Sequence, residues 1–179
     1  MLKNLYLICG KSGSGKTWIV DKLHNEYNYK VLKSYTTRPK RHPSDNDHIY
    51  VSLSNYYLDK ANNVIAADTY FNKNFYWSRH AQLLESELYV IDKKGIETLV
   101  SSENIDRKFV VIYIKCSEEK RIEHMRMRGD KQKDIYERLS NDKKEFIGIE
   151  HFADFIVNGD DDSKWITVKN IIDKCEEVS

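Results

Sequence analysis

Proline, glycine and long apolar runs are scarce in this sequence of 179 residues, and each scarcity excludes a class of protein. The two prolines and seven glycines leave no flexible linker, repeat or low-complexity tract. The apolar runs are short, such as FVVIYI at 109–114, far below the roughly 20 residues of a membrane span. The apolar start, LYLIC at 5–9, is too brief for a signal peptide and is predicted to be a buried first strand. We expect no association with a membrane.

A field of one charge sign and paired cysteines are also missing. The formal net charge is +1, so the chain lacks the broad basic field on which non-specific nucleic-acid binding depends. Cys9, Cys116 and Cys175 lie far apart and form no CxxC pair, which argues against a disulfide framework and against a zinc site. We expect three buried cysteines in a cytoplasmic protein that binds no nucleic acid.

Short apolar strands alternate with longer segments of helical spacing. The chain is long enough, and at 40% hydrophobic residues apolar enough, for one sizeable domain. Because strands and helices alternate, we predict an α/β fold, a doubly wound parallel sheet with helices on both faces. The predicted strands span 5–9, 87–92, 109–114 and 152–157, and the predicted helices span 16–27, 94–101, 117–127, 132–147 and 163–175.

Two stretches depart from this rhythm. Residues 34–83 are rich in Tyr, Asn and Asp, and we expect an inserted lobe of short strands with one or two helices. Residues 118–147 are highly charged and are expected to form two helices of a mobile flap, although a solvated helix pair would carry the same charges. The core of the single domain 1–179 then consists of residues 1–33, 84–117 and 148–179.

A phosphate-binding loop is the strongest motif. GKSGSGKT at 10–17 matches GxxxxGK(S/T) and lies between an apolar strand and a helical segment. In such a loop, glycines let successive backbone N–H groups turn toward a phosphate, and the helix N-terminus adds positive partial charge. Lys16 would reach the β- and γ-phosphates of a nucleotide, and the Thr17 hydroxyl would bind Mg²⁺. The predicted nucleotide-binding residues are Gly10, Lys11, Ser12, Gly13, Ser14, Gly15, Lys16 and Thr17.

The loop by itself does not distinguish a kinase from other nucleotide-binding enzymes. DKKG at 92–95 fits the DxxG of GTPase switch regions. A GTPase would also need an NKxD-type guanine reader downstream, and none follows, since NKN at 72–74 lies upstream and ends in the wrong residue. The sequence therefore favours a kinase.

Hydroxyl and basic side chains cluster at 34–41, SYTTRPKR. A solvated turn has the same composition, but a kinase with a phosphorylated acceptor must hold a dianion close to the donor phosphates. Arginine suits this role because its planar group binds phosphate bidentately and stays protonated. Pro39 fixes the turn between Arg38 and Arg41, so that both guanidinium groups can converge on one phosphate.

This cluster resembles the S-x-TTR-x-x-R segment of guanylate kinases, which phosphorylate GMP with ATP. Further segments resemble family motifs in the same order, from Leu5 to about Ile172: DHIYVS (47–52), NFYWS (74–78), VIDKKG (90–95), MRGD (127–130), RLS (138–140) and FADFIVNGD (152–160). The resemblance implies a P-loop kinase that uses ATP and Mg²⁺ on nucleotide substrates. It also implies that the inserted lobe binds the nucleoside monophosphate (NMP) and that the charged helix pair is a lid.

The resemblance implies five acceptor-binding residues within the inserted lobe. Arg38 and Arg41 would bind the acceptor phosphate together with the Tyr76 hydroxyl, while Ser34 and Ser78 would line the acceptor site. Tyr76 stands in a chain with 12 tyrosines, so a role in packing alone stays open.

The remaining roles lie between donor and acceptor. Asp92 would contact the acceptor and orient Mg²⁺, through water, or the nucleotide sugar, and Asn158 would contact the donor base. Arg128 and Arg138 would close over the transferring phosphoryl group, unless Arg138 pairs with Asp134 or Asp142 on its own helix. The predicted catalytic residues are Lys16, Arg41, Asp92, Arg128 and Arg138.

Three positions depart from the family pattern. His48 stands where the family has a phosphate-binding tyrosine, and it could still donate to phosphate, particularly if the neighbouring Tyr50 favours its protonation. An ordinary surface histidine is the open alternative. Ala67 replaces the glutamate that reads guanine, and the adjacent Asp68 would point to the opposite face of a strand. Trp77 replaces a glycine, and its indole could stack on a base or fill part of its pocket.

These observations leave three hypotheses. The first is ATP-dependent phosphorylation of an NMP, with GMP or dGMP the best single acceptor. The second is a kinase of another NMP or of a sugar phosphate such as ribose bisphosphate, because the base reader has changed. The third is a binding module without catalysis, which the intact Lys16 and Thr17 disfavour.

Overall fold

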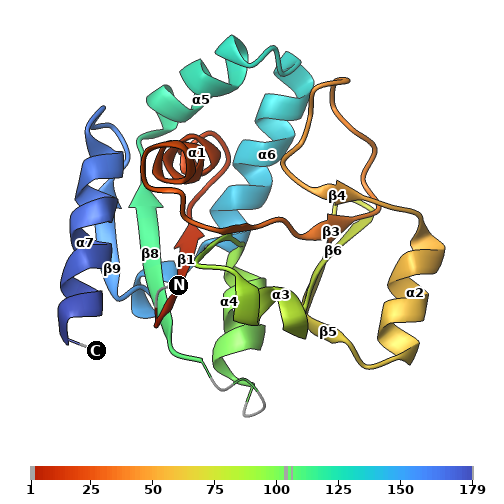
Figure 1. The fold of residues 1–179 in the computed structure, drawn as a ribbon. Coiled ribbons are helices and arrows are strands. Elements are labelled where there is room, and N and C mark those ends of the chain that lie inside the picture. Colours follow the sequence, from red (N-terminus) through yellow and green to blue (C-terminus); the bar gives the residue numbers. More distant parts are fainter. Residues whose placement is uncertain (1–2, 103–104, 106, 179) are drawn as a thin grey trace.

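The computed structural model describes residues 3–102, 105 and 107–178. Its central sheet contains, in spatial order, β2 (Val31–Leu32), β7 (Leu88–Val90), β1 (Leu5–Cys9), β8 (Phe109–Lys115) and β9 (Phe155–Asn158) (Figure 1). Every neighbouring pair is parallel, so the predicted parallel sheet is confirmed. Of these five strands, the sequence analysis missed only β2, whose two residues are too few to form a pattern.

Five of the described α-helices agree with the predicted ones to within three residues at each end. Two more, Leu53–Ala61 and His80–Glu85, begin within the inserted stretch, where one or two helices were expected without bounds. Helix α6 (Gln132–Glu145) ends two residues earlier than expected because Gly148 takes a left-handed conformation, with a φ of 74°. A short 3₁₀ turn at Ile149–His151 follows it. The helices are α1 (Lys16–Tyr27), α2 (Leu53–Ala61), α3 (His80–Glu85), α4 (Lys93–Val100), α5 (Glu118–Met127), α6 (Gln132–Glu145) and α7 (Lys164–Val178). None of them is both long and apolar enough to cross a membrane.

Different helices cover the two faces of the sheet because successive side chains of β1 point in opposite directions. Tyr6 and Ile8 pack with the apolar residues of α1 and α7. Leu5, Leu7 and Cys9 pack on the other face with residues of α3 and α4. Strand β1 is therefore buried between two apolar layers, and the loop that follows it starts from a fixed point.

The prediction of three buried cysteines is wrong for two of them. Cys9 is buried in β1, whereas Cys116 and Cys175 are half-buried. Cys116 lies just beyond the end of β8 and Cys175 near the end of α7, where neighbouring elements cover the side chains only in part.

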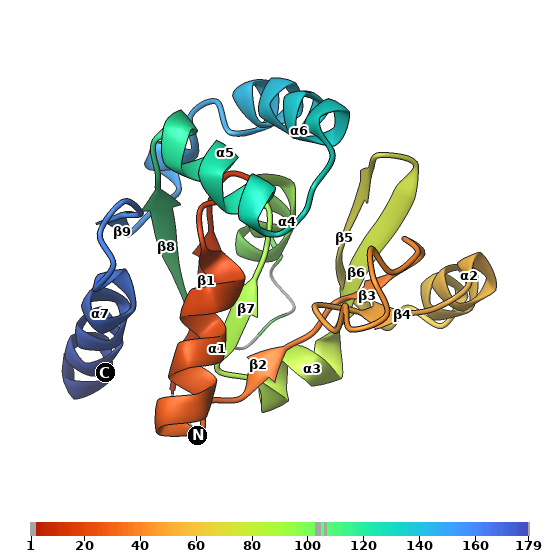
Figure 2. The same ribbon diagram turned by 90° about the horizontal axis from the view of Figure 1, so that it is seen from above.

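A second, smaller sheet is inserted between β2 and β7, as the polar composition of this stretch predicted. Its spatial order is β4 (Ile49–Tyr50), β3 (Tyr35–Thr36), β6 (Asn74–Arg79) and β5 (Ile65–Phe71), and α2 packs beside it (Figure 1). Viewed from above, α5 and α6 extend from the end of β8 across the top of the molecule toward this inserted sheet (Figure 2). The space between the main sheet, the inserted sheet and the two helices is where the predicted functional residues gather.

Trp77 and Asp59 hold the inserted sheet to α2. The indole of Trp77 is 1% exposed, and its Nε1 donates to Asp59 at 2.8 Å. Arg79 also donates to Asp59, from Nε at 2.7 Å and from Nη2 at 2.9 Å. The ring of Tyr35 stacks on the indole at 5.5 Å between centroids. Burial would raise the pKa of Asp59, but the bonds from Arg79 and Trp77 outweigh it and lower that pKa.

We expect Asp59→Ala to lower the free energy of unfolding by about 2–3 kcal/mol, because it leaves the buried indole N–H without an acceptor. Asp59→Asn keeps an acceptor oxygen and should lose less. Since folding lowers the pKa of Asp59, its ionic contribution is complete above the unfolded value of about 4 and disappears as the pH falls below it. Urea denaturation at pH 7 and pH 3 measures both effects, and equal stability of Asp59→Ala and the wild type at pH 7 would contradict this role.

Candidate functional site

The phosphate loop joins β1 to α1, as predicted. Gly15 immediately precedes α1 with a φ of 89°, a left-handed conformation that glycine adopts without strain. Gly13 has a φ of 78°, and a Cβ added there would lie 2.5 Å from the carbonyl oxygen of Arg121. Glycine is therefore required for the loop to lie against α5, and the loop reaches the positive end of α1 in the conformation that presents N–H groups to an anion.

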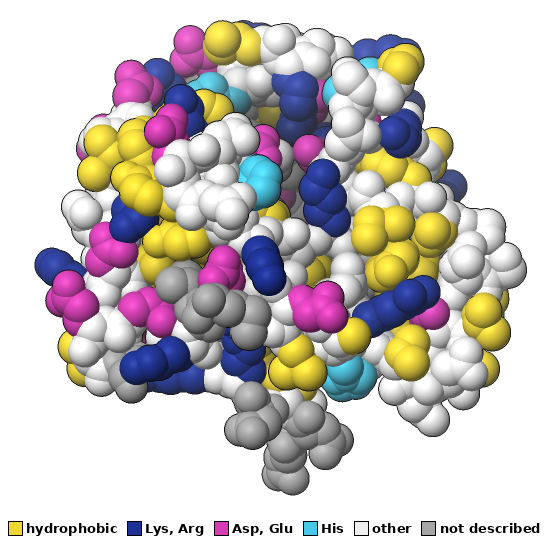
Figure 3. Space-filling model, in the orientation of Figure 1, with side chains coloured by type: hydrophobic (Ala, Val, Ile, Leu, Met, Phe, Trp, Pro, Cys, Tyr) yellow, Lys and Arg dark blue, Asp and Glu magenta, His cyan; other side chains and the backbone are white. Residues whose placement is uncertain are grey.

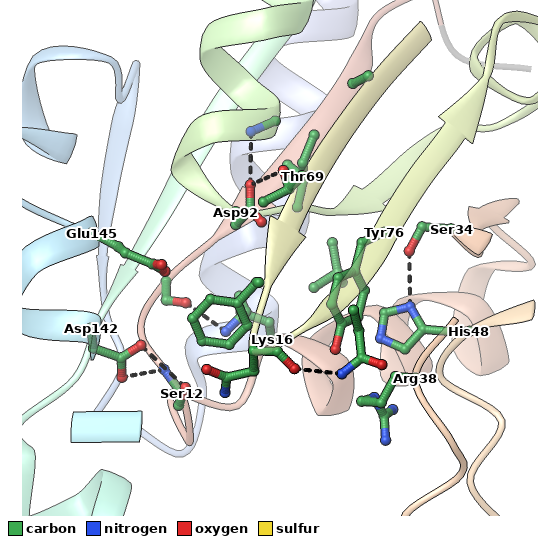
Figure 4. A pocket seen from close by; sticks show the side chains of 18 of the residues that line it. Ser12, Lys16, Ser34, Arg38, His48, Thr69, Tyr76, Asp92, Asp142 and Glu145 are labelled. Carbon is green, nitrogen blue, oxygen red and sulfur yellow. Dashed lines mark hydrogen bonds between the residues drawn. The ribbon is translucent and has the colours of Figure 1, made fainter. Parts of the chain in front are cut away.

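Lys16 is folded back onto this loop (Figure 4). Its Nζ donates to the carbonyl oxygens of Gly10 at 2.6 Å and Lys11 at 3.1 Å. Burial of the ammonium lowers the pKa of Lys16 to about 8, although the carboxylate of Asp142 opposes this shift. The cation is thus held at the loop by weak carbonyl partners, ready to exchange them for a stronger acceptor.

Asp142 of α6 contacts the tip of the loop. Its carboxylate accepts from the N–H of Ser12 at 2.9 Å and from the Ser12 hydroxyl at 3.2 Å. It also accepts from Nη1 of Arg121 on α5 at 2.7 Å, and both charged side chains are almost completely buried. This pair joins α5, α6 and the loop. The charged composition of 118–147 did not predict it, because the same residues fit a solvated surface.

The turn that carries Arg38 and Arg41 is organised by Asp45. The buried carboxylate of Asp45 accepts from Nη2 of Arg38 at 3.1 Å, from the N–H of Arg41 at 3.0 Å and from the Tyr50 hydroxyl. Burial alone would raise the pKa of Asp45, but these bonds hold it well below its usual range. Arg38 is only 9% exposed. The alternative of a solvated turn is therefore wrong for Arg38, which is fixed at the edge of a cavity.

Three further arginines, Arg41, Arg128 and Arg138, lie around one point. The Asp130 carboxylate accepts from Nε of Arg128 at 3.0 Å and lies 3.7 Å from Nε of Arg138. The pKa of Arg41 is lowered by burial and by the charges of Arg138, Arg38 and Arg128. Asp130 thus stands as an anion among cations, and it is the partner of Arg138; the predicted alternatives, Asp134 and Asp142, are not.

This positive charge belongs to the interior of the site. On the face shown in Figure 3, acidic and basic side chains are interspersed, in line with a net charge of +1. The cavity between the loop and the inserted sheet is lined by four cations, Lys16, Arg38, Arg41 and Arg138, and also by the carboxylates of Asp68, Asp92, Asp142 and Glu145. Asp142 is paired with Arg121 and Asp68 is bonded to Tyr56, so the cations that remain at the loop and the turn can bind the phosphate groups of an anionic ligand.

The polar wall of this cavity comes from the inserted sheet (Figure 4). Ser34 and His48 are joined by a hydrogen bond of 2.8 Å between Oγ and Nδ1, and Tyr76 lies edge-on to the histidine ring at 5.4 Å. Burial and the nearby Arg38 lower the pKa of His48 to about 4. The condition that would most favour a phosphate contact, protonation of His48, is therefore not met, and at neutral pH its imidazole has one N–H to donate. Ser78, also predicted here, is fully buried and does not line the cavity.

Asp92 forms the floor of the cavity as the N-cap of α4. Its Oδ1 accepts from the N–H of Gly95 at 2.7 Å and from the Thr69 hydroxyl at 3.2 Å. Burial raises the pKa of Asp92 despite these two bonds. Thr69 enters the site because its side chain points to the same face of β5 as that of Ala67, two residues earlier. The sequence analysis did not identify it.

The changes from the guanylate kinase pattern at Ala67 and Trp77 leave the guanine-reading position without a carboxylate, although Asp92, Asp142 and Glu145 also line the cavity. Ala67 lines the cavity and has no polar side chain. Asp68 also lines the cavity, but its carboxylate accepts from the Tyr56 hydroxyl at 2.5 Å. Trp77 pairs with Asp68 across the hairpin and is buried in the inserted sheet. The hypothesis that its indole stacks on a base or fills the pocket is wrong for this structure.

A second cavity of about 520 Å³ opens on the other side of the loop, and of the residues above it shares only Lys16 with the first. It is lined by Thr17 and Trp18 of α1, by His124 and Met127 of α5, and by Arg128 and Lys164. Asn158, the predicted contact of the donor base, does not line it. Its Oδ1 accepts from the N–H of Asp160 at 3.0 Å instead.

Comparisons with known proteins agree with this architecture. A family model described as guanylate kinase matches residues 2–175. Among solved structures, the chain is similar to a crystal structure of guanylate kinase from Anaplasma phagocytophilum, with a TM-score of 0.73 and 20% identity, over 98% of this chain and 87% of that one. At this identity the likeness shows the fold alone. No curated protein matches the chain.

We expect Asp142→Ala to lower the free energy of unfolding by about 3–5 kcal/mol, because the buried guanidinium of Arg121 loses its counter-ion. Arg121→Met should cost a similar amount. The double variant Arg121→Met/Asp142→Leu removes both charges and should be more stable than either single variant. The deficit that remains relative to the wild type, about 1 kcal/mol, reports the lost bond from Ser12 N–H. Urea denaturation of all four proteins makes the comparison, and additive losses in the double variant would contradict the pairing.

Proposed function

Since this chain belongs to the guanylate kinase family, we propose that it transfers the γ-phosphoryl group of ATP to a nucleoside monophosphate. The observation that carries the proposal is the pair of cavities on either side of the phosphate loop, with Lys16 common to both. The donor would lie in the cavity at Thr17, and the acceptor in the cavity that ends at Arg38 and Arg41. The phosphoryl group would then pass from the donor cavity to the acceptor cavity beside Lys16.

The acceptor phosphate would bind at the turn of the inserted sheet. Arg41 bears the guanidinium with fewer partners, since its own contact is a distant ion pair with Asp47 at 3.8 Å. Arg38 is held in place by Asp45, but its buried Nε has no partner among the described residues and remains a donor. Tyr76 and neutral His48 add one uncharged donor each, which holds a dianion without further repulsion between cations.

Transfer itself would rest on positioning and on neutralisation of charge. Lys16 would exchange its loop carbonyls for donor phosphate oxygens, and Arg128 and Arg138 would exchange Asp130 for the transferring group. In each exchange, a more highly charged anion takes the place of the protein group to which the side chain is bonded in the structure. Closure of the proposed lid, residues 118–147, toward the proposed NMP-binding lobe, residues 34–83, would exclude water and suppress hydrolysis.

The hydroxyl of Thr17 and the carboxylate of Asp92 are the oxygen ligands available for Mg²⁺. No cluster of three or more acidic, histidine or cysteine side chains that could hold a metal occurs among the described residues. That sparse set fits Mg²⁺, which is usually bound through one or two protein oxygens together with phosphates and water. When bound, the ion would neutralise charge on the donor phosphates. With Oδ1 bonded to Gly95 and Thr69, Oδ2 of Asp92 is left for a water molecule or a nucleotide.

GMP or dGMP remains the best single acceptor. The support is the family, together with the hydroxyl of Ser34 and the carboxylate of Asp92 on the wall and floor of the cavity. Because Ala67 offers no acceptor and Asp68 is bonded to Tyr56, a base that lacks the guanine 2-amino group loses less here than in a site with the glutamate of the family pattern. This observation favours, as the alternative, a kinase of another NMP or of a sugar phosphate.

A coupled assay of ADP release tests the function directly. With ATP and Mg²⁺, we expect turnover with GMP or dGMP among a panel of GMP, dGMP, IMP, AMP, CMP, UMP, dTMP and ribose bisphosphate. Arg138→Ala should lower kcat by roughly 10³-fold or more, by analogy with arginine fingers. Lys40→Ala is the matched control, because Lys40 neighbours Arg41 but bonds to Asn46 and lines neither cavity.

The outcomes of this assay separate the hypotheses. Turnover with another acceptor alone would retain the kinase and change the substrate. No turnover with any acceptor, while ADP still binds to the wild type and not to Lys16→Ala, would overturn the kinase and favour a binding module.

Nucleotide binding should also take up a proton near pH 8.5. Lys16 in the free protein has a pKa of about 8, and the phosphates of ADP favour its charged form. The affinity for MgADP is therefore highest below pH 8 and falls as the pH rises through that value. Titration calorimetry in two buffers of different ionisation enthalpy measures the proton. Lys16→Arg, whose side chain stays charged, should bind without proton uptake, and equal uptake by both proteins would contradict the assignment.

A further inference from the structure

Trp18 is an aromatic side chain exposed beside the phosphate loop. It follows Thr17 in the first turn of α1, its side chain lines the second cavity, and it remains 42% exposed. Met127, at the last position of α5, lines the same cavity and is 80% exposed. Large apolar side chains exposed together in one cavity usually mark a surface that a ligand covers.

Lys164 anchors the indole to the loop. This lysine is only 5% exposed, and its Nζ lies 5.2 Å from the centroid of the Trp18 ring, within the range of a cation–π contact. A Cβ added to Gly15 would lie 3.1 Å from Cε of Lys164, so the lysine packs against the loop as well. The position of the aromatic ring is therefore coupled to that of the phosphate-binding backbone.

The lining of the cavity combines two kinds of chemistry. The loop, Lys16 and Arg128 suit phosphate groups, and the carboxylate of Asp162 also lines the cavity. The indole of Trp18 and the side chain of Met127 suit a flat apolar ring. A nucleoside polyphosphate carries the same two kinds of group, phosphates and a flat base. Asn158, whose side chain is bonded to Asp160 N–H, is not part of this surface.

We propose that Trp18 stacks on the base of the donor nucleotide, with Met127 covering the same base from α5. This inference rests on the donor site of the proposed function. Stacking on an indole needs only the flat face of a ring, so Trp18 would supply affinity for adenine and guanine alike. Trp18 is accordingly a residue that positions the donor base, and the choice between bases lies elsewhere.

Binding of MgADP, measured without an acceptor, tests this stacking. Trp18→Ala should weaken MgADP and MgGDP by a similar factor, about 10–100-fold, while Trp18→Phe stays within about threefold of the wild type. Inorganic tripolyphosphate has no base, and its affinity should be the same for the wild type and Trp18→Ala. Equal weakening of tripolyphosphate and MgADP would instead show that Trp18 only supports the loop, and unchanged MgADP affinity would show that it touches no base. Either result overturns the proposal.

Tryptophan fluorescence gives a second, independent readout. MgADP should quench the wild-type emission, and the quenching should vanish in Trp18→Phe but persist in Trp165→Phe, whose half-buried indole lies against Tyr27. Quenching that survives in Trp18→Phe would overturn the stacking. Both measurements concern binding alone. Stacking without turnover would therefore contradict the kinase proposal and leave the stacking proposal intact. Turnover in a protein whose MgADP affinity does not depend on Trp18 would contradict the stacking proposal and leave the kinase proposal intact.

Discussion

Repulsion between like charges is the constraint on which the site depends. A common space is lined by Lys16, by the arginines of the inserted sheet and by those of the α5–α6 pair. Their positive charges repel one another unless anions lie between them. Three aspartates supply those anions in the structure. Asp45 fixes the turn of Arg38 and Arg41, Asp130 lies between Arg128 and Arg138, and Asp142 neutralises Arg121 beside the loop. Asp45 and Asp130 hold in place cations that the proposed reaction would use, and Asp142 holds the loop.

Much of the fold could be predicted because its signals are local. A buried parallel strand is an uninterrupted apolar run. The phosphate loop is a contiguous motif in which the backbone conformation requires glycine. The same holds for the cluster of Arg38 and Arg41. Elements such as β2, with two residues, carry too little pattern to be found.

The parts of the site that were missed arise from contacts between distant segments. Asp142 bonds to Ser12 across 130 positions, and nothing near either residue distinguishes that carboxylate from the other charges of the helix pair. Trp77 was misread for a related reason. Its burial follows from the register of the hairpin, in which its neighbour Tyr76 is opposite Thr69 on the cavity face, so that the indole lies on the other face. Strand alternation alone does not predict the face of Trp77, which needs the register of the hairpin as well.

The hydrogen bond from Ser12 to Asp142 also makes α6 a participant in anion binding. An anion that takes this N–H must displace the carboxylate, so occupation of the loop and the placement of α6 become thermodynamically linked. The linkage is reciprocal. An interaction that stabilises the bonded position of α6 weakens the affinity of the loop for the anion, and the bound anion destabilises that position of α6 by the same factor. Substitutions far out on this helix can therefore tune nucleotide affinity without touching a nucleotide.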